Sequence, residues 1–333
     1  MPQFTLIRRL AVPALAAALI VAGAWWGLGP GPRLAVPVIV EIPSGSGHTG
    51  IARQLADAGV IRSPLGFEAW SLLHRRDRLK AGTYRFTGGA TVPAVYRMLA
   101  RGQFYSIALV VPEGYSRFDI ARELAERGLA DPAAFLRVTA DPSLVRDLDP
   151  AAVSLEGYLF PATYPVPPHA DPAHLAALMV ARFRRELRDE GAHPADLHAW
   201  VTLASLVEKE TSVPAERPLV AGVFTNRLAQ RLPLQCDPTV IYAAVLAGRY
   251  DGSLHRADLD FDSPYNTYRH PGLPPGPIAN PGRQALLAAA QPAHTGFMYF
   301  VSDGHGQHRF ARTLAEQRQN VQLYLRALRG GGH

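Results

Sequence analysis

The 333-residue sequence has a single cysteine and lacks the motifs that mark several common protein classes. Because Cys236 has no partner, the chain forms no internal disulfide and must fold by packing alone. No signature of a cysteine nucleophile surrounds Cys236, so we expect a small buried residue there. A glycine-rich nucleotide loop and a GxSxG elbow are absent, as are an RNP motif, a zinc finger and a lysine-rich arm. We therefore expect no cofactor and no nucleic-acid partner.

Charge and composition set broader limits. Hydrophobic residues make up 48% of the chain, enough to fill the cores of about two domains. The chain has 34 basic and 28 acidic residues, with the arginines scattered, and a formal charge of +6. A basic balance suits nucleic acid, anionic lipid or acidic wall polymers, so charge alone does not select the partner.

The N-terminus contains a long uncharged run. Leu10–Leu28 follows Arg8 and Arg9 and has 19 residues without a charge, close to the ~20 that a helix needs to cross a bilayer. The preceding arginines favour a cytoplasmic N-terminus. A cleaved signal peptide is the alternative, since Ala22–Ala24 is a weak cleavage-like triplet. We predict a cytoplasmic stub and a retained single-pass transmembrane helix over residues 1–33, with the remainder exported.

Two exported segments repeat each other. Ile42–Ile61 aligns without gaps to Val111–Ala130, at an offset of 69. Each copy has the pattern of a short strand, a Pro/Gly turn and an amphipathic helix closed by glycine, and Leu79–Phe86 favours a returning strand. The pattern resembles the LysM type of glycan-binding module, which we expect over residues 34–104. A duplication that serves packing alone remains open, because the matching residues are structural ones.

Helices dominate the sequence from about Asp131 onward. Near the end, the segment Phe297–Ala311 predicts a β-hairpin with DGHG at its turn. The predicted fold class is α+β, with an N-terminal transmembrane helix, the small LysM-like module and a mainly helical α+β catalytic domain over 105–329. Within that domain, 105–130 repeats the strand–helix unit.

One predicted helix, over about Ala195–Thr211, ends in two glutamates. The residues three, four and seven positions before Glu210 are all apolar, whereas the same offsets from Glu208 give a smaller, partly polar set. Glu210 therefore projects from the more apolar face, in the last turn, where the helix dipole disfavours a negative charge. Both effects favour the protonated form that a general acid needs near neutral pH. The alternative is two solvated glutamates at a fraying helix end.

Five ordered motifs make the sequence resemble the endolytic murein transglycosylase family, also called MltG or YceG-like. They are ASLVEKET, NRL, LQCDPTVIYA, SPYNTYRHPGLPPGPIANPG and YFVSDGHGQHRFA. The resemblance covers nearly the whole exported chain and departs at Cys236, where a small hydroxyl residue is expected. It implies a cell-wall lyase that cleaves the β-1,4 bond between N-acetylmuramic acid (MurNAc) and N-acetylglucosamine (GlcNAc) within nascent glycan strands. The muramic C6 hydroxyl closes onto C1, no water is added, and 1,6-anhydro ends remain.

The resemblance also implies roles for particular residues. Glu210 is the expected catalytic residue, which protonates the leaving oxygen and then takes the proton of the C6 hydroxyl. A hydrolase usually needs two carboxylates, but a lyase whose substrate supplies the nucleophile manages with one. The expected substrate-binding residues are Glu156, Gln235, Asp237, Tyr265, Asn266, Thr267 and Tyr268. Three alternatives stay open: Glu156 as a turn acid or second carboxylate, Asp237 as a helix cap, and Asn266 as a turn residue.

Remaining predictions concern metals, partners and location. His305 and His308 have HxxH spacing but fall in the predicted hairpin turn, so we expect no metal and assign His308 a hydrogen bond. Expected partners are peptidoglycan glycan strands, the membrane and penicillin-binding synthases. The expected location is the bacterial inner (cytoplasmic) membrane, with the catalytic domain in the periplasm. A peptidoglycan-binding membrane tether without activity and a two-carboxylate muramidase are the competing functions.

Overall fold

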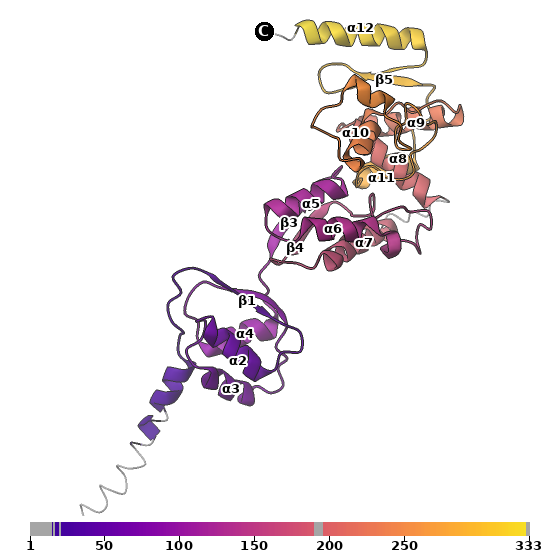
Figure 1. Cartoon of the computed structure of the whole chain (residues 1–333). Helices are drawn as coiled ribbons and strands as arrows, with labels where there is room; N and C mark the ends of the chain where they lie inside the picture. The colour runs from indigo at the N-terminus through magenta and orange to yellow at the C-terminus, as the bar shows by residue number, and fades with distance from the viewer. Residues whose placement is uncertain (1–14, 16, 20, 190–195, 331–333) are drawn as a thin grey trace, which may run out of the picture. The chain divides into compact units, whose positions relative to one another are not determined.

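The computed structural model describes residues 15, 17–19, 21–189 and 196–330. The chain divides into two compact units, Met1–Ile107 and Ala108–His333 (Figure 1). The domain limits expected from the sequence, after residues 33 and 104, remain predictions.

Unit 1 is built on one antiparallel strand pair. Its elements are β1 (Val38–Ile42), α2 (His48–Asp57), α3 (Pro64–Leu73), β2 (Gly82–Phe86) and α4 (Val92–Arg101). Val38 lies opposite Phe86 and Ile42 opposite Gly82, which confirms the predicted returning strand. Alternate β1 residues, Val40 and Ile42, are buried, as expected for a strand with one face on a core.

Unit 2 begins with the same order of elements. These are β3 (Ile107–Val111), α5 (Arg117–Glu126), α6 (Pro132–Ala140), β4 (Ala162–Val166) and α7 (Pro172–Asp189), with the short helix η1 (Pro142–Leu144) before β4. β3 pairs with β4, and α6 packs against both α5 and α7 (Figure 1). The sequence repeat therefore marks two successive strand–helix–helix–strand–helix segments.

The matching residues of the repeat occupy equivalent structural positions. The buried pairs are Ile51/Ile120, Ala52/Ala121 and Leu55/Leu124. The paired glycines have left-handed φ angles, 83° and 78° at Gly45/Gly114 and 71° and 61° at Gly59/Gly128. Because only glycine adopts these angles without strain, the predicted turn and helix stop are confirmed in both copies.

The rest of unit 2 is mainly helical. Its elements are α8 (Leu197–Glu210), η2 (Pro214–Glu216), α9 (Arg217–Ala229), α10 (Asp237–Leu246), η3 (Arg256–Asp260), α11 (Arg283–Ala290), β5 (Tyr299–Ser302), β6 (His308–Ala311) and α12 (Leu314–Gly330). α8 packs between α9 and α11 and buries every residue from Trp200 to Val207. β5 and β6 form the predicted hairpin, with left-handed Gly304 and Gly306 at its turn.

The predicted fold class needs one correction, which concerns its N-terminal transmembrane helix. Among the described residues, none of the helices has the length and apolar character that crossing a membrane requires. Part of the predicted segment, residues 10–14, 16 and 20, lies outside the described residues, and the uninterrupted helical stretch that follows covers 21–28. Crossing a bilayer takes about 20 apolar residues. The single-pass inner-membrane location predicted from this segment is corrected on the same ground, and the fold is a mixed α+β structure.

Candidate active site

A cavity of about 460 Å³ in unit 2 has Glu210 in its wall. The end of α8, the side of α9, the loop before α10, the β5–β6 hairpin and the start of α12 surround it. Its polar lining includes Glu210, Arg227, Gln235, Asp237, Tyr268 and His308. This volume falls within the range of small-ligand sites in proteins.

Glu210 is the last residue of α8, and the buried helix delivers it to the cavity. Asp196 caps the start of α8 by accepting a hydrogen bond from Ala199 N, and Thr211 leaves the helix in an extended conformation. Burial raises the pKa of Glu210 to about 7; the hydrogen bond from the Cys236 thiol lowers it, the Asp237 carboxylate raises it and His308 lowers it. An acid with this pKa gives up and regains a proton readily near neutral pH.

Glu208 serves a different purpose from Glu210, although both glutamates end the same helix. The Glu208 side chain is 5% exposed, and it accepts hydrogen bonds from Arg217 Nη2 at 2.9 Å and Gly282 N at 3.0 Å. It joins α8 to α9 and to the start of α11. The alternative of two solvated glutamates is therefore wrong, because one lies in an internal ion pair and the other faces a cavity.

Three of the predicted substrate-binding residues lie with Glu210 in the cavity wall: Gln235, Asp237 and Tyr268. Gln235 has a left-handed φ of 54°, unusual for a residue with a side chain, and its Oε1 accepts a 2.6 Å hydrogen bond from Arg227 Nη2. Tyr268 donates its hydroxyl to Asp237 Oδ1. Asp237 is the first residue of α10 and makes no side-chain cap of that helix, whose N-cap position belongs to Cys236.

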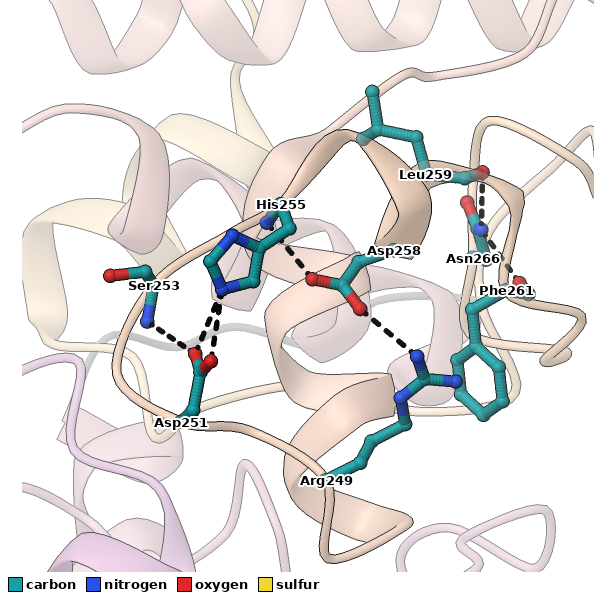
Figure 2. Close-up of polar contacts among 8 residues, drawn as sticks. All are labelled: Arg249, Asp251, Ser253, His255, Asp258, Leu259, Phe261 and Asn266. Carbon is teal, nitrogen blue, oxygen red and sulfur yellow. Dashed lines mark hydrogen bonds and ion pairs between the residues drawn. The ribbon is translucent and has the colours of Figure 1, made fainter.

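Asn266 lies near these residues but turns its side chain into its own loop. It is fully buried, and its Nδ2 donates to the carbonyl oxygens of Leu259 at 2.9 Å and Phe261 at 2.8 Å (Figure 2). Its Oδ1 accepts from Tyr268 N at 3.0 Å. The contacts of Asn266 are therefore those of a turn residue, the alternative left open above. Its side chain is linked to the cavity wall through the hydrogen bond from Tyr268 N.

The loop that Figure 2 shows is also tied together by surface ion pairs. His255 Nε2 lies 2.9 Å from Asp251 Oδ2, and Arg249 Nη2 lies 3.3 Å from Asp258 Oδ1. These contacts link residues within the segment between α10 and Asn266, on the solvent-exposed side of that loop.

Thr267 and Tyr265 also lie outside the cavity wall. Thr267 is 1% exposed, and its Oγ1 accepts a hydrogen bond from Cys236 N at 3.0 Å. This bond keeps Cys236 fully buried against Glu210, which confirms the expectation of a small buried residue at position 236. The Tyr265 ring packs on Tyr242, with 5.1 Å between the ring centroids.

Glu156 is 1% exposed and lies outside the residues that line the cavity. Both of its oxygens accept from Arg117 N, at 3.0 and 3.1 Å, and it also accepts from Asn280 Nδ2 at 2.9 Å and the Tyr242 hydroxyl at 3.0 Å. Burial raises the pKa of Glu156 to about 7, although its hydrogen bonds oppose the shift. The carboxyl joins the start of α5 to α10 and the loop before α11.

Sequence reasoning missed two residues that shape the cavity. Arg227 sits in its wall and holds Gln235, and Glu216 holds His308 by a 2.7 Å contact between Oε2 and Nδ1. Glu216 and His308 are 92 positions apart in the chain, so no local pattern marks them as partners. The sequence predicted a hydrogen bond for His308, and the structure confirms it, whereas His305 lies exposed in the hairpin turn.

Comparison with known proteins agrees with the resemblance read from the motifs. The profile of the YceG-like family matches residues 40–323, most of the chain. The chain belongs to the YceG-like family. A relative from Bacillus subtilis (strain 168), named endolytic murein transglycosylase, is 32% identical, with 86% of this chain and 85% of the relative covered.

Two further comparisons extend over most of this YceG-like chain. A Streptococcus pneumoniae (strain D39) protein of the same name is 29% identical, with 85% of this chain and 58% of that protein covered. A crystal structure of a YceG-like protein from Listeria monocytogenes matches with a TM-score of 0.54 and 33% identity, covering 85% of this chain and 98% of that one.

Proposed function

We infer that this chain is an endolytic murein transglycosylase, which cleaves the MurNAc–GlcNAc β-1,4 bond within peptidoglycan strands and leaves 1,6-anhydro-MurNAc ends. Relatives of that name align over most of its length. The observation that carries the inference is the position of Glu210, a carboxyl whose pKa burial raises to about 7 in the wall of a ligand-sized cavity. A membrane tether without activity has no need for such a group.

In the proposed reaction, Glu210 acts twice. Its proton passes to the oxygen of the leaving GlcNAc as the bond from that oxygen to C1 of MurNAc breaks. The muramic C6 oxygen then bonds to C1, and its proton returns to the Glu210 carboxylate. No water is consumed, and the enzyme regains its starting protonation state. A group with a pKa near 7 suits both transfers, because neither proton state is strongly favoured.

The other predicted site residues divide by their position. Gln235, Asp237 and Tyr268, which line the cavity, are proposed to contact the glycan. The remaining members of the predicted set are proposed to act through the scaffold. Asn266 and Thr267 accept hydrogen bonds from the backbone at Tyr268 and Cys236, while Tyr265 and Glu156 both contact Tyr242 of α10.

We further propose that residues 34–104 form a LysM-like glycan-binding module, which would raise the local concentration of strands at the enzyme. The strand–helix–helix–strand order of β1, α2, α3 and β2 supports this proposal. Contact with penicillin-binding synthases belongs with it, since these enzymes make the nascent strands that the site would cut.

Digestion of purified peptidoglycan, followed by mass spectrometry of the fragments, tests the function. We expect internal cleavage with anhydro ends. Reducing ends, heavier by one water, would instead identify a muramidase with a second carboxylate, and Asp237 is the candidate because it lines the same cavity. Absence of released fragments would identify a binding protein.

A further inference from the structure

Both carboxylate oxygens of Glu216 accept hydrogen bonds from one histidine, His308. Its Oε2 accepts a hydrogen bond from His308 Nδ1 at 2.7 Å, and its Oε1 accepts from His308 N at 2.8 Å. The Thr211 hydroxyl, which belongs to the residue directly after Glu210, donates to Oε2 at 3.1 Å. Both the ring and the backbone of His308 are thus held by the same group.

This arrangement selects one tautomer of the histidine. Burial alone would raise the pKa of Glu216, but the hydrogen bonds from His308 and Thr211 outweigh burial and lower it, so the group is an ionised acceptor. An ionised acceptor keeps the proton on His308 Nδ1. In the neutral ring, Nε2 is then a lone-pair acceptor.

The Nε2 atom of His308, which Glu216 does not contact, belongs to a residue that lines the cavity. His308 lines the cavity together with Glu210, and its side chain is 16% exposed. The Phe300 ring packs edge-on against it, with 5.4 Å between centroids and an interplanar angle of 89°. In the described part of the chain, the hydrogen bonds of His308 are those to Glu216, which leaves Nε2 available for a ligand.

In the reaction proposed above, the muramic C6 hydroxyl is a hydrogen-bond donor that the His308 Nε2 acceptor suits. The muramic C6 hydroxyl must lose its proton as its oxygen bonds to C1, so an acceptor at that hydroxyl both aligns the oxygen and increases its nucleophilicity. The hydroxyl has a single hydrogen, so its hydrogen bond to His308 Nε2 orients it before the glycosidic bond breaks. Once the first transfer has ionised Glu210, the hydroxyl turns that hydrogen to the Glu210 carboxylate and releases it there as its oxygen bonds to C1, and His308 is left unchanged.

We propose that His308 is a second substrate-contacting residue of this site, whose Nε2 accepts a hydrogen bond from the attacking hydroxyl of the glycan, and that Glu216 is its positioning residue. The proposal rests on the proposed function, since it concerns the hydroxyl that attacks C1.

Two substitutions of His308 separate contact from scaffold. In His308→Asn the amide nitrogen replaces Nδ1, so the bond to Glu216 survives while the Nε2 acceptor is lost. In His308→Gln the amide oxygen reaches the place of Nε2. We expect H308N to fold normally and to lose roughly 10²-fold in rate at saturating glycan, with little change in KM. H308Q should recover part of the rate.

Glu216→Gln tests the positioning role. Because His308 N still needs an acceptor, the new amide oxygen stays there and its NH₂ group faces Nδ1. The histidine then carries its proton on Nε2, which becomes a donor. We expect a rate loss similar to that of H308N and a double variant no slower than either single one, as residues that act as a unit behave. His305→Asn, in the exposed hairpin turn, is the control that should leave the rate unchanged.

The assay follows anhydro fragments released from peptidoglycan, with thermal unfolding measured in parallel. A normal rate in H308N would overturn the proposal. A second outcome would also overturn it: H308N loses rate together with a lowered unfolding midpoint, and H308Q loses rate to the same extent. The role of His308 would then be structural. If the wild-type protein released no anhydro fragments, the proposed function itself would fail, and this outcome is distinct from either of the others.

Discussion

The surroundings of Glu156 and Glu210 show how similar carboxyl groups in one protein come to serve different ends. Burial raises the pKa of each to about 7. The oxygens of Glu156 accept from a backbone N–H, an asparagine amide and a tyrosine hydroxyl. Glu210 instead faces a cavity of about 460 Å³, with the Cys236 thiol as a weak donor on its protein side.

This contrast separates a shifted pKa from a role in chemistry. A perturbed pKa marks candidates for a functional site, but structural networks perturb pKa values as well. The oxygens of Glu156 are occupied by the protein, so a substrate has no route to its proton. Access to a cavity, more than the size of the shift, is what favours Glu210 as the acid.

The largest effect expected from this comparison is on catalysis. Glu210→Gln removes the transferable proton and keeps the size of the side chain, so we expect fragment release to fall by roughly 10³-fold or more. Thermal unfolding should change little. Quantification of anhydro fragments by mass spectrometry measures the loss. Turnover at the wild-type rate in E210Q would refute the assignment of Glu210.

Next in size is a loss of stability at the other carboxyl. Glu156→Ala leaves the donors of Arg117 N, Asn280 and Tyr242 buried without an acceptor, which should cost about 3 kcal/mol of unfolding free energy. Urea denaturation measures it, and activity per folded molecule should survive. If E156A were as stable as wild type but as inactive as E210Q, Glu156 would be needed for the chemistry and its structural role would be wrong.

The pH dependence comes third. The first step needs protonated Glu210, so the rate should fall as pH rises through about 7. The contribution of Glu210 to stability changes with pH in the same direction. Its pKa is near 4.5 in the unfolded chain and about 7 in the folded one, so the group stabilises the folded state fully below pH 4.5. This contribution is lost as pH rises through about 7. Because glutamine stays neutral, E210Q should gain stability relative to wild type above pH 7. A rate that rises across this range would contradict the role as acid.

The smallest expected effect is at Cys236. A hydroxyl is a stronger donor than a thiol, so Cys236→Ser should stabilise the ionised form of Glu210 and lower its pKa. The alkaline limb of the rate profile should then move to lower pH by less than about one unit. Cys236→Ala, which removes the donor, should move the limb the other way. Identical profiles for all three proteins would show that the thiol has no influence on the acid.

Local patterns predicted much of the fold. The repeat predicted two strand–turn–helix units, in which Ile51/Ile120, Ala52/Ala121 and Leu55/Leu124 are buried and the matching glycines are left-handed, and turn glycines predicted the hairpin. These features depend on neighbours within a few positions, which a sequence displays directly. The transmembrane prediction is the part of the fold class that was wrong. It relied on the length of an uncharged run in the sequence, and the length of such a run does not by itself fix the length of the helix that forms.

The candidate site divides along the same line. From the sequence alone, the apolar face of a helix singled out Glu210 over Glu208, and the motifs identified the family, because periodicity and motif order are written along the chain. Only the tertiary structure decided which residues meet: it put Gln235, Asp237, Tyr268 and His308 in the wall with Glu210 and left Glu156 and Asn266 outside. The physical reason is that a cavity is made by side chains from distant segments, so their meeting depends on how the whole chain packs.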